Sequence, residues 1–169
     1  MYAGHAALAL FAKAKRPRVP LVLLVPLAFA PDWVELIAAA FGRHNRMISH
    51  SLVSVGIGAT LFAVTYLLAT RSAADAAAVW LTYVSHWPAD FITGIKPTWP
   101  GGPMVGLHLY QHPIWDVVLE TVLVVVAWLV YRRSLKPEVQ KRSVAALIPL
   151  GLIAIQIGFA ALQYPKIEL

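Results

Sequence analysis

The sequence of 169 residues contains no cysteine. This absence excludes disulfide bonds, thiolate ligands and cysteine nucleophiles, so a transition-metal site must use His, Asp, Glu, backbone or water. Charged residues are also scarce at 13%, about half their share in ordinary soluble domains. Apolar residues reach 59%, which exceeds the roughly 45–50% of such domains. We therefore predict a polytopic membrane protein in which residues 1–169 form one domain.

The net charge of +6 does not indicate a nucleic-acid partner. The basic residues form short clusters between apolar segments, as they do in the loops of membrane proteins. Residues 13–18 and 21–30 imitate a signal peptide, but an apolar segment precedes them and Pro31 would follow the cut. We expect no nucleic acid binding and no cleavage.

The apolar segments predict an all-α helical bundle of about five or six helices, some of them short or broken. The segments long enough to span a bilayer are residues 51–70, 73–92, 113–131 and 143–163. Residues 3–14 predict a short helix. Residues 21–30 cannot cross about 30 Å of hydrocarbon alone, so we expect a helix that breaks near Pro31.

The basic residues and the His and Asp residues fall on opposite sides of this arrangement. Ten of the fourteen Lys and Arg residues lie on one side, which is therefore expected to be cytoplasmic. Hydropathy defines the spans, and the Lys and Arg residues define their orientation, so neither depends on the His and Asp positions. Their common location therefore indicates a site, which should open on the non-cytoplasmic side, the periplasm if the source is a Gram-negative bacterium.

The motif His86-x-x-x-Asp90 ends one of the apolar segments. Residues four apart share one face of a helix, so this imidazole and carboxylate form half of a site for zinc or a similar divalent metal. The alternative is a helix-end His beside an Asp solvated at the membrane interface. Ionisable residues are costly to bury in a membrane segment, which favours a functional site.

The spacing recurs in His112-x-x-x-Asp116, and steps of four extend it to His108 and Glu120. These residues share one slowly rotating stripe if the region is helical, although Pro113 is the expected helix start. The alternative is that the carboxylates stabilise a helix N-terminus. Whether His108 and Glu120 join the site stays open.

Earlier in the chain, His5, Asp32 and His50 are further candidate metal ligands. Asp32 and Glu35 are also candidate catalytic carboxylates, as a general base or as a group that orients a ligand. The alternatives are a Pro-Asp pair that only starts a helix and an interfacial His50 followed by a Ser cap. His44 is expected to be exposed in a loop.

Arg43, Arg46 and Lys96 are basic residues on the side expected to carry the site. We predict that they bind a substrate phosphate, and that Lys96 also assists catalysis by neutralising its charge. The alternative is contact with lipid headgroups.

The order of these motifs resembles the family of membrane-bound metal-dependent hydrolases, some of which are LexA-regulated inner-membrane proteins. The matching residues are His5, Pro31-Asp32, His44-Asn45-Arg46 with His50-Ser51, and His86 to Asp90. The order is also distantly similar to that of the zinc-dependent phospholipase C and single-strand nuclease superfamily, which consists of all-helical enzymes with three zinc ions. By position, this resemblance implies that the ligands are His5, Asp32, His50, His86, Asp90, His112 and Asp116.

Two positions depart from that superfamily. A His is expected some six residues after Asp90, where this chain has Lys96. The ligating N-terminal amine requires a cleavage that the sequence does not signal. The resemblance therefore implies one or two metal ions, with zinc as the first candidate and manganese as the second.

Together these residues predict a metal-dependent hydrolase of a lipid or lipid-linked phosphoester that uses a metal-activated water. The alternatives are a metal or proton transporter, a haem protein, and a non-catalytic membrane protein with a metal site. A transporter would carry ligands at several depths of the membrane. A haem protein would carry His residues on facing helices, without accompanying carboxylates. The sequence does not determine the substrate or the oligomeric state.

Overall fold

The computed structural model describes residues 3–42, 47–140 and 147–163, which are mostly helical. The elements are α1 (Ala3–Lys15), α2 (Leu21–Ala28), α3 (Ala30–Ala40), the 3-10 helix η1 (Ile48–His50), α4 (Leu52–Thr70), α5 (Ala73–Val84), α6 (His86–Thr93), β1 (Lys96–Pro97), β2 (Met104–Val105), the 3-10 helix η2 (Leu109–Gln111), α7 (Pro113–Ser134), α8 (Pro137–Gln140) and α9 (Leu147–Gln163). The all-α prediction is confirmed for these residues apart from the two short strands.

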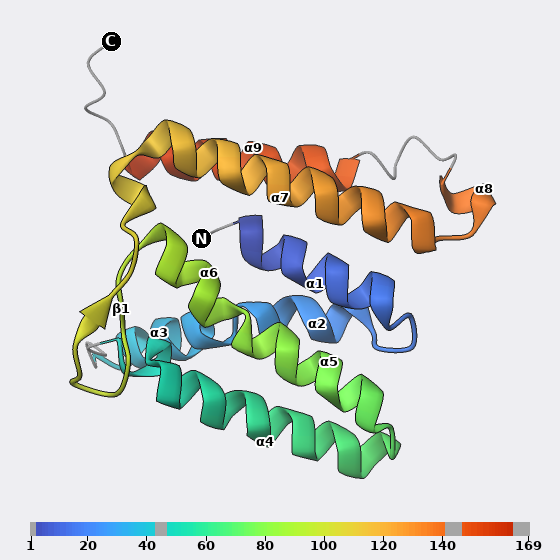
Figure 1. Cartoon of the computed structure of the whole chain (residues 1–169), viewed down its shortest axis with the longest axis horizontal. Helices are drawn as coiled ribbons and strands as arrows, with labels where there is room; N and C mark the ends of the chain where they lie inside the picture. Colours follow the sequence, from blue (N-terminus) through green and yellow to red (C-terminus); the bar gives the residue numbers. More distant parts are fainter. Residues whose placement is uncertain (1–2, 43–46, 141–146, 164–169) are drawn as a thin grey trace.

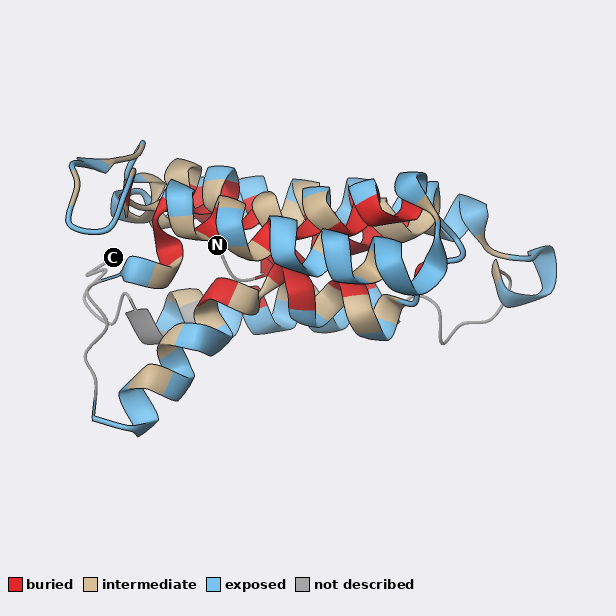
Figure 2. Ribbon diagram, turned by 90° about the horizontal axis from the view of Figure 1, so that it is seen from below, coloured by how far each residue is buried: buried red, intermediate tan, exposed pale blue. Residues whose placement is uncertain are grey.

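Helix α1 lies at the centre of the bundle, between α7 and α9 on one side and α2, α4 and α5 on the other (Figure 1). Its buried positions are mainly Ala and Gly, which let neighbouring backbones approach closely. One apolar cluster joins α1 to α7 through Ala7 and Val124. A second joins α1, α2, α4 and α5 through Ala9, Leu24 and Val79. Figure 2 shows the buried residues gathered along the middle of the bundle.

Helices α4 and α7 are long and apolar enough to cross a membrane, and the bent pair α2–α3 would be a third such span. Their outward faces carry large apolar side chains, and Leu61, Leu68 and Ile114 are each more than half exposed. The predicted spans 51–70 and 113–131 are therefore confirmed in length and composition. The predicted span 143–163 begins outside the described residues and continues as α9.

Two predicted helix boundaries differ from the structure. The segment 73–92, predicted as one span, forms α5 and α6 with an interruption at Ser85. Pro88 has no N–H to donate to the Val84 carbonyl, which weakens the helix at that point. The break predicted near Pro31 lies at Phe29, where α2 and α3 bend by 63°. Pro31 is in the first turn of α3, where a missing N–H leaves no helical hydrogen bond unmade.

The loop between α6 and α7 carries the antiparallel strands β1 and β2, in which Lys96 pairs with Val105. Gly106 crosses the backbone of Gly94 so closely that a Cβ atom would overlap the Gly94 carbonyl. The Leu107 N–H also donates to the Phe91 carbonyl. These contacts hold the loop, and with it Lys96, against the end of α6.

The segments rich in basic residues lie at the opposite end of the bundle from this loop (Figure 1). They are the α1–α2 connection, the α4–α5 turn at Arg71 and the end of α7. The tight turn at Arg71–Ser72 matches the sequence prediction, and the Ser72 hydroxyl caps α5 by accepting from the Asp75 N–H. Ser51 caps α4 in the same way.

Two glycines of α4 offer a matched test of this packing. A Cβ at Gly58 would lie 2.7 Å from Cζ of the buried Tyr83, whereas a Cβ at Gly56 meets no atom within 4 Å. We expect Gly58→Ala to lower the free energy of unfolding by about 1–3 kcal/mol, because the core is overpacked. Gly56→Ala should raise it by about 0.5–1 kcal/mol, because Ala favours the helix. Thermal unfolding in detergent measures both, and equal effects would contradict the α4–α5 packing.

Candidate metal centre

Four side chains from three separate elements converge at the end of the bundle that carries the β1–β2 loop. They are Asp32 in the first turn of α3, His50 at the end of η1, and His86 and Asp90 on α6. One ligand atom of each lies within 4.8 Å of the other three. His86 and Asp90 share a face of α6 because they are four residues apart, as the sequence predicts.

The distances between these atoms suit a tetrahedral metal ion. His50 Nε2 lies 2.9 Å from Asp32 Oδ1 and 3.8 Å from Asp90 Oδ2. His86 Nε2 lies 3.7 Å and 3.2 Å from the same two oxygens. Zinc bound at about 2.0–2.2 Å requires tetrahedral ligands about 3.3–3.5 Å apart, and the four distances fall on both sides of that range.

The outer nitrogen of each imidazole already has an acceptor. His86 Nδ1 donates to the Ala28 carbonyl at 2.9 Å, and His50 Nδ1 lies 2.8 Å from Glu35 Oε2. In neutral histidines these contacts place the protons on Nδ1, which leaves both Nε2 atoms as lone-pair donors. Such outer contacts orient metal-binding histidines and raise their basicity. The bend between α2 and α3 helps here, because α2 ends at Ala28 and its carbonyl is free to accept from His86.

Carboxylates outnumber ammonium groups among the described residues of this centre. Glu35, Asp32 and Asp90 supply three carboxylates, and Lys96 Nζ, 2.8 Å from Asp90 Oδ2, supplies one ammonium. With neutral histidines, two negative charges remain. Lone pairs of His50 and His86 then face carboxylate oxygens, an arrangement that a divalent cation would stabilise.

His5, predicted as a ligand, lies beside this group and outside it. Its ring is fully buried and stacks on His86 with centroids 4.1 Å apart. Its Nε2 lies 3.2 Å from Asp90 Oδ1, the oxygen that faces away from the four converging atoms. His5 therefore orients the Asp90 carboxylate so that Oδ2 is directed at the centre.

The second predicted pair does not join the group. His112 is exposed at the start of α7, and His108 is exposed as well. The buried Asp116 accepts from Gln156 Nε2 at 3.2 Å, and Glu120 accepts from the Gly4 N–H at 2.9 Å. In α7, packing against α1 and α9 turns both carboxylates toward the start of α1, where free helix N–H groups need acceptors.

Of the remaining predicted site residues, some contact the metal centre and the others lie outside the described residues. Glu35 contacts His50, and Lys96 contacts Asp90, so both lie at the centre. The predicted phosphate-binding residues Arg43 and Arg46, and His44, lie outside the described residues.

Three groups that contact the predicted site residues were not predicted from the sequence. The Ala28 carbonyl and the Ser49 hydroxyl, 3.1 Å from His50 Nδ1, carry no sequence signal. Gln156 does carry one, because it is an amide in the middle of an apolar helix and is almost fully buried. Buried amides require partners, so its position could have pointed to Asp116.

The contact between Glu35 and His50 predicts a graded effect on metal affinity. We expect Glu35→Gln to weaken binding about 10- to 100-fold, because the neutral amide supports the imidazole less well. Excess metal should restore occupancy, since the four ligands remain. Metal titration of detergent-purified protein measures this, with Glu138→Gln on α8 as the matched control. Unchanged affinity in Glu35→Gln would show that this contact does not tune the centre.

Comparisons of the chain with protein-family models, with curated proteins and with solved structures found no match. The chemistry of the centre therefore has to be inferred from its own residues. Those residues are two imidazoles and two carboxylates that converge on one point, with an ammonium beside them.

Proposed function

We propose that the protein is a membrane-embedded metal-dependent hydrolase that acts on a lipid or lipid-linked phosphoester. The convergence of Asp32, His50, His86 and Asp90 carries the proposal, because two carboxylates meet two imidazoles whose outer nitrogens already contact the Ala28 carbonyl and Glu35. The resemblance of the motif order to membrane-bound metal-dependent hydrolases points to the same chemistry.

The burial pattern favours a catalytic centre over a structural one. The side chains of His50, His86 and Asp90 are at most 5% exposed, whereas that of Asp32 is 44% exposed. The bundle therefore covers the group at His50, His86 and Asp90, whereas solvent reaches it at Asp32. Catalytic zinc sites keep such an open position for water or substrate, whereas structural sites are closed.

Each residue has a role in this proposal. A bound divalent metal, Zn²⁺ or Mn²⁺, supplies a Lewis acid for the phosphoryl oxygen and lowers the pKa of water. Glu35 holds the His50 ring, so it is no longer a free base. Asp32, the carboxylate on the open side, is the candidate general base, and in that role it leaves the metal to His50, His86 and Asp90 with water in the fourth position. Lys96 would neutralise charge on the phosphate.

A lipid substrate follows from the proposed location in the membrane. The exposed apolar faces of α4 and α7 would contact lipid, which places the centre near one membrane interface. The basic segments lie at the opposite end of the bundle. By the positive-inside rule the centre would face the non-cytoplasmic side of a bacterial inner membrane.

The transport alternative fits the interior less well. Further into the bundle from the metal centre, the interior is filled by buried apolar side chains of α2, α4 and α5, namely Leu24, Val55 and Val79. In the described interior these residues belong to an apolar cluster that links the four helices on that side. A transported cation would need polar partners at successive depths there.

The proposal is tested on the wild-type protein in detergent. Mass spectrometry should find zinc or manganese bound to each chain, and lipid phosphoesters should be hydrolysed in a reaction that a chelator stops and added metal restores. Metal binding without hydrolysis would favour a non-catalytic metal site. Folded protein that takes up no metal after reconstitution would overturn the proposal.

A further inference from the structure

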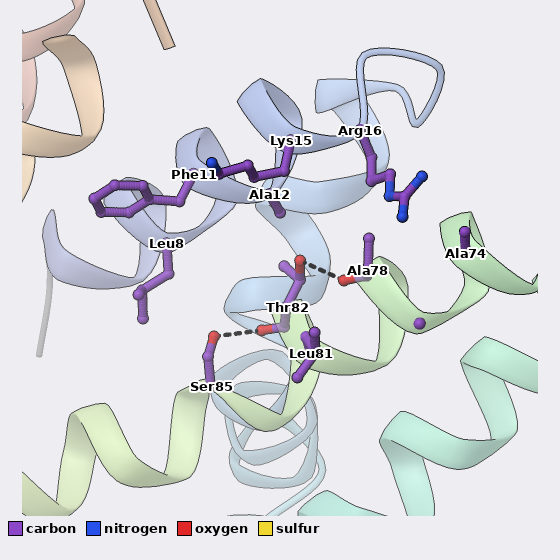
Figure 3. A pocket seen from close by; sticks show the side chains of 11 residues that line it. Leu8, Phe11, Ala12, Lys15, Arg16, Ala74, Ala78, Leu81, Thr82 and Ser85 are labelled. Carbon is purple, nitrogen blue, oxygen red and sulfur yellow. Dashed lines mark hydrogen bonds between the residues drawn. The ribbon is translucent and has the colours of Figure 1, made fainter. Parts of the chain in front are cut away.

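A cavity lies between α1 and α5, and none of the four converging metal-ligand candidates lines it (Figure 3). Its volume is about 460 Å³, and its walls are mainly apolar side chains such as Leu8, Phe11 and Leu81. The two hydroxyl groups in the wall donate to carbonyls of their own helix, Thr82 to Ala78 and Ser85 to Thr82. The cavity therefore offers no free hydroxyl donor and suits a hydrocarbon chain.

Positive charge marks one end of this cavity. Lys15 and Arg16 line it, are exposed, and form no ion pair with an acidic side chain in the described part of the chain. Figure 3 shows both residues on the same rim. By contrast, Lys13 donates to the Pro17 and Val19 carbonyls and so serves the loop.

The length of the cavity matches one leaflet of a bilayer. It follows α5 from Ala74 to Ser85, about 16 Å at 1.5 Å per residue. The hydrocarbon of a whole bilayer is about 30 Å thick. A further cavity of about 260 Å³ shares Leu8 and Ser85 with the first and continues along α6 to Ile92. A chain that enters at the basic rim therefore has space to the bilayer midplane and beyond.

We propose that this cavity binds an anionic glycerophospholipid, with an acyl chain along α5 and the phosphate on Lys15 and Arg16. The charge at the rim and the depth of the cavity favour this ligand. A zwitterionic lipid has no net negative charge to pair with the two cations, and a soluble anion would not contact the apolar walls. Anionic lipids are also enriched in the cytoplasmic leaflet, where the positive-inside rule places this rim. The proposal rests on membrane embedding and is independent of the hydrolase activity.

Native mass spectrometry of protein released from bilayers of equal phosphatidylglycerol and phosphatidylcholine content tests the site. The wild-type protein should retain phosphatidylglycerol preferentially. The double variant Lys15→Gln, Arg16→Gln should lose roughly 25-fold in phosphatidylglycerol retention, about fivefold for each charge removed. Equal retention of the two lipids by the wild type would overturn the proposal.

Two further variants separate this site from a general attraction to the basic end. Arg133→Gln with Lys136→Gln removes two exposed charges at the same end but leaves the cavity unchanged, so the preference should persist. Ala77→Trp places a ring in the cavity at an exposed position and should reduce retention of lipid while both cations remain. A loss in the first of these variants, or none in the second, would contradict the proposal.

Discussion

Asp90→Asn should yield a folded protein that binds no metal and hydrolyses no lipid phosphoester. Asp90 Oδ2 lies within 3.8 Å of the Nε2 atoms of His50 and His86, as Asp32 Oδ1 does, but the Asp90 side chain is 5% exposed and that of Asp32 is 44% exposed. An amide oxygen carries no charge and is a poor ligand for a divalent ion. The loss in affinity should exceed the roughly 100-fold cost of losing an outer partner, and hydrolysis should fall to background.

Asp75→Asn is the matched control for this prediction. Asp75 is a buried carboxylate in the first turn of α5, and α5 starts at the end of the bundle opposite the β1–β2 loop (Figure 1). Its change should cost about 0.3–1 kcal/mol of stability through the start of α5, with metal content and hydrolysis unchanged. Metal analysis and circular dichroism of both variants decide the outcome. A metal content of Asp90→Asn equal to that of the wild type would remove Asp90 from the ligand set.

Lys96→Met should separate metal binding from catalysis. The ammonium of Lys96 lies 2.8 Å from Asp90 Oδ2, the same oxygen that is directed at the metal position. Met keeps the length of the side chain and removes the charge, so metal affinity should stay the same or rise. Hydrolysis should fall about 10²- to 10³-fold, which is the typical cost of losing one group that stabilises transition-state charge.

Activity and metal content have to be measured on the same preparation for this variant. Lys96→Arg should recover part of the rate, because it restores a cation that can bind phosphate. Lys136→Met changes an exposed residue between α7 and α8, which meet at the opposite end of the bundle (Figure 1), and should behave as the wild type in both measurements. Loss of metal in Lys96→Met would show that Lys96 supports the centre and not the substrate.

Local features of the fold were predictable because they depend on neighbouring residues. The apolar length of α4 and α7, the turn at Arg71 and the Ser51 cap all follow from short stretches of sequence. The pairing of His86 with Asp90 does too, since helical spacing alone puts the two on one face. The breaks at Phe29 and Ser85 were harder to place, because each results from a proline two or three residues away.

Helical structure, apolar composition and the gathering of His and carboxylate groups at one end of the helices all follow from the order of residues along the chain. Which of these groups meet depends on how the helices pack. Packing of α3, η1 and α6 brought Asp32 and His50 to the His86–Asp90 pair and set Glu35 behind His50. Packing of α7 on α1 and α9 turned Asp116 to Gln156 instead. The spacing of His112 and Asp116 equals that of His86 and Asp90, so the direction in which each helix faces, and not its motif, sets the difference.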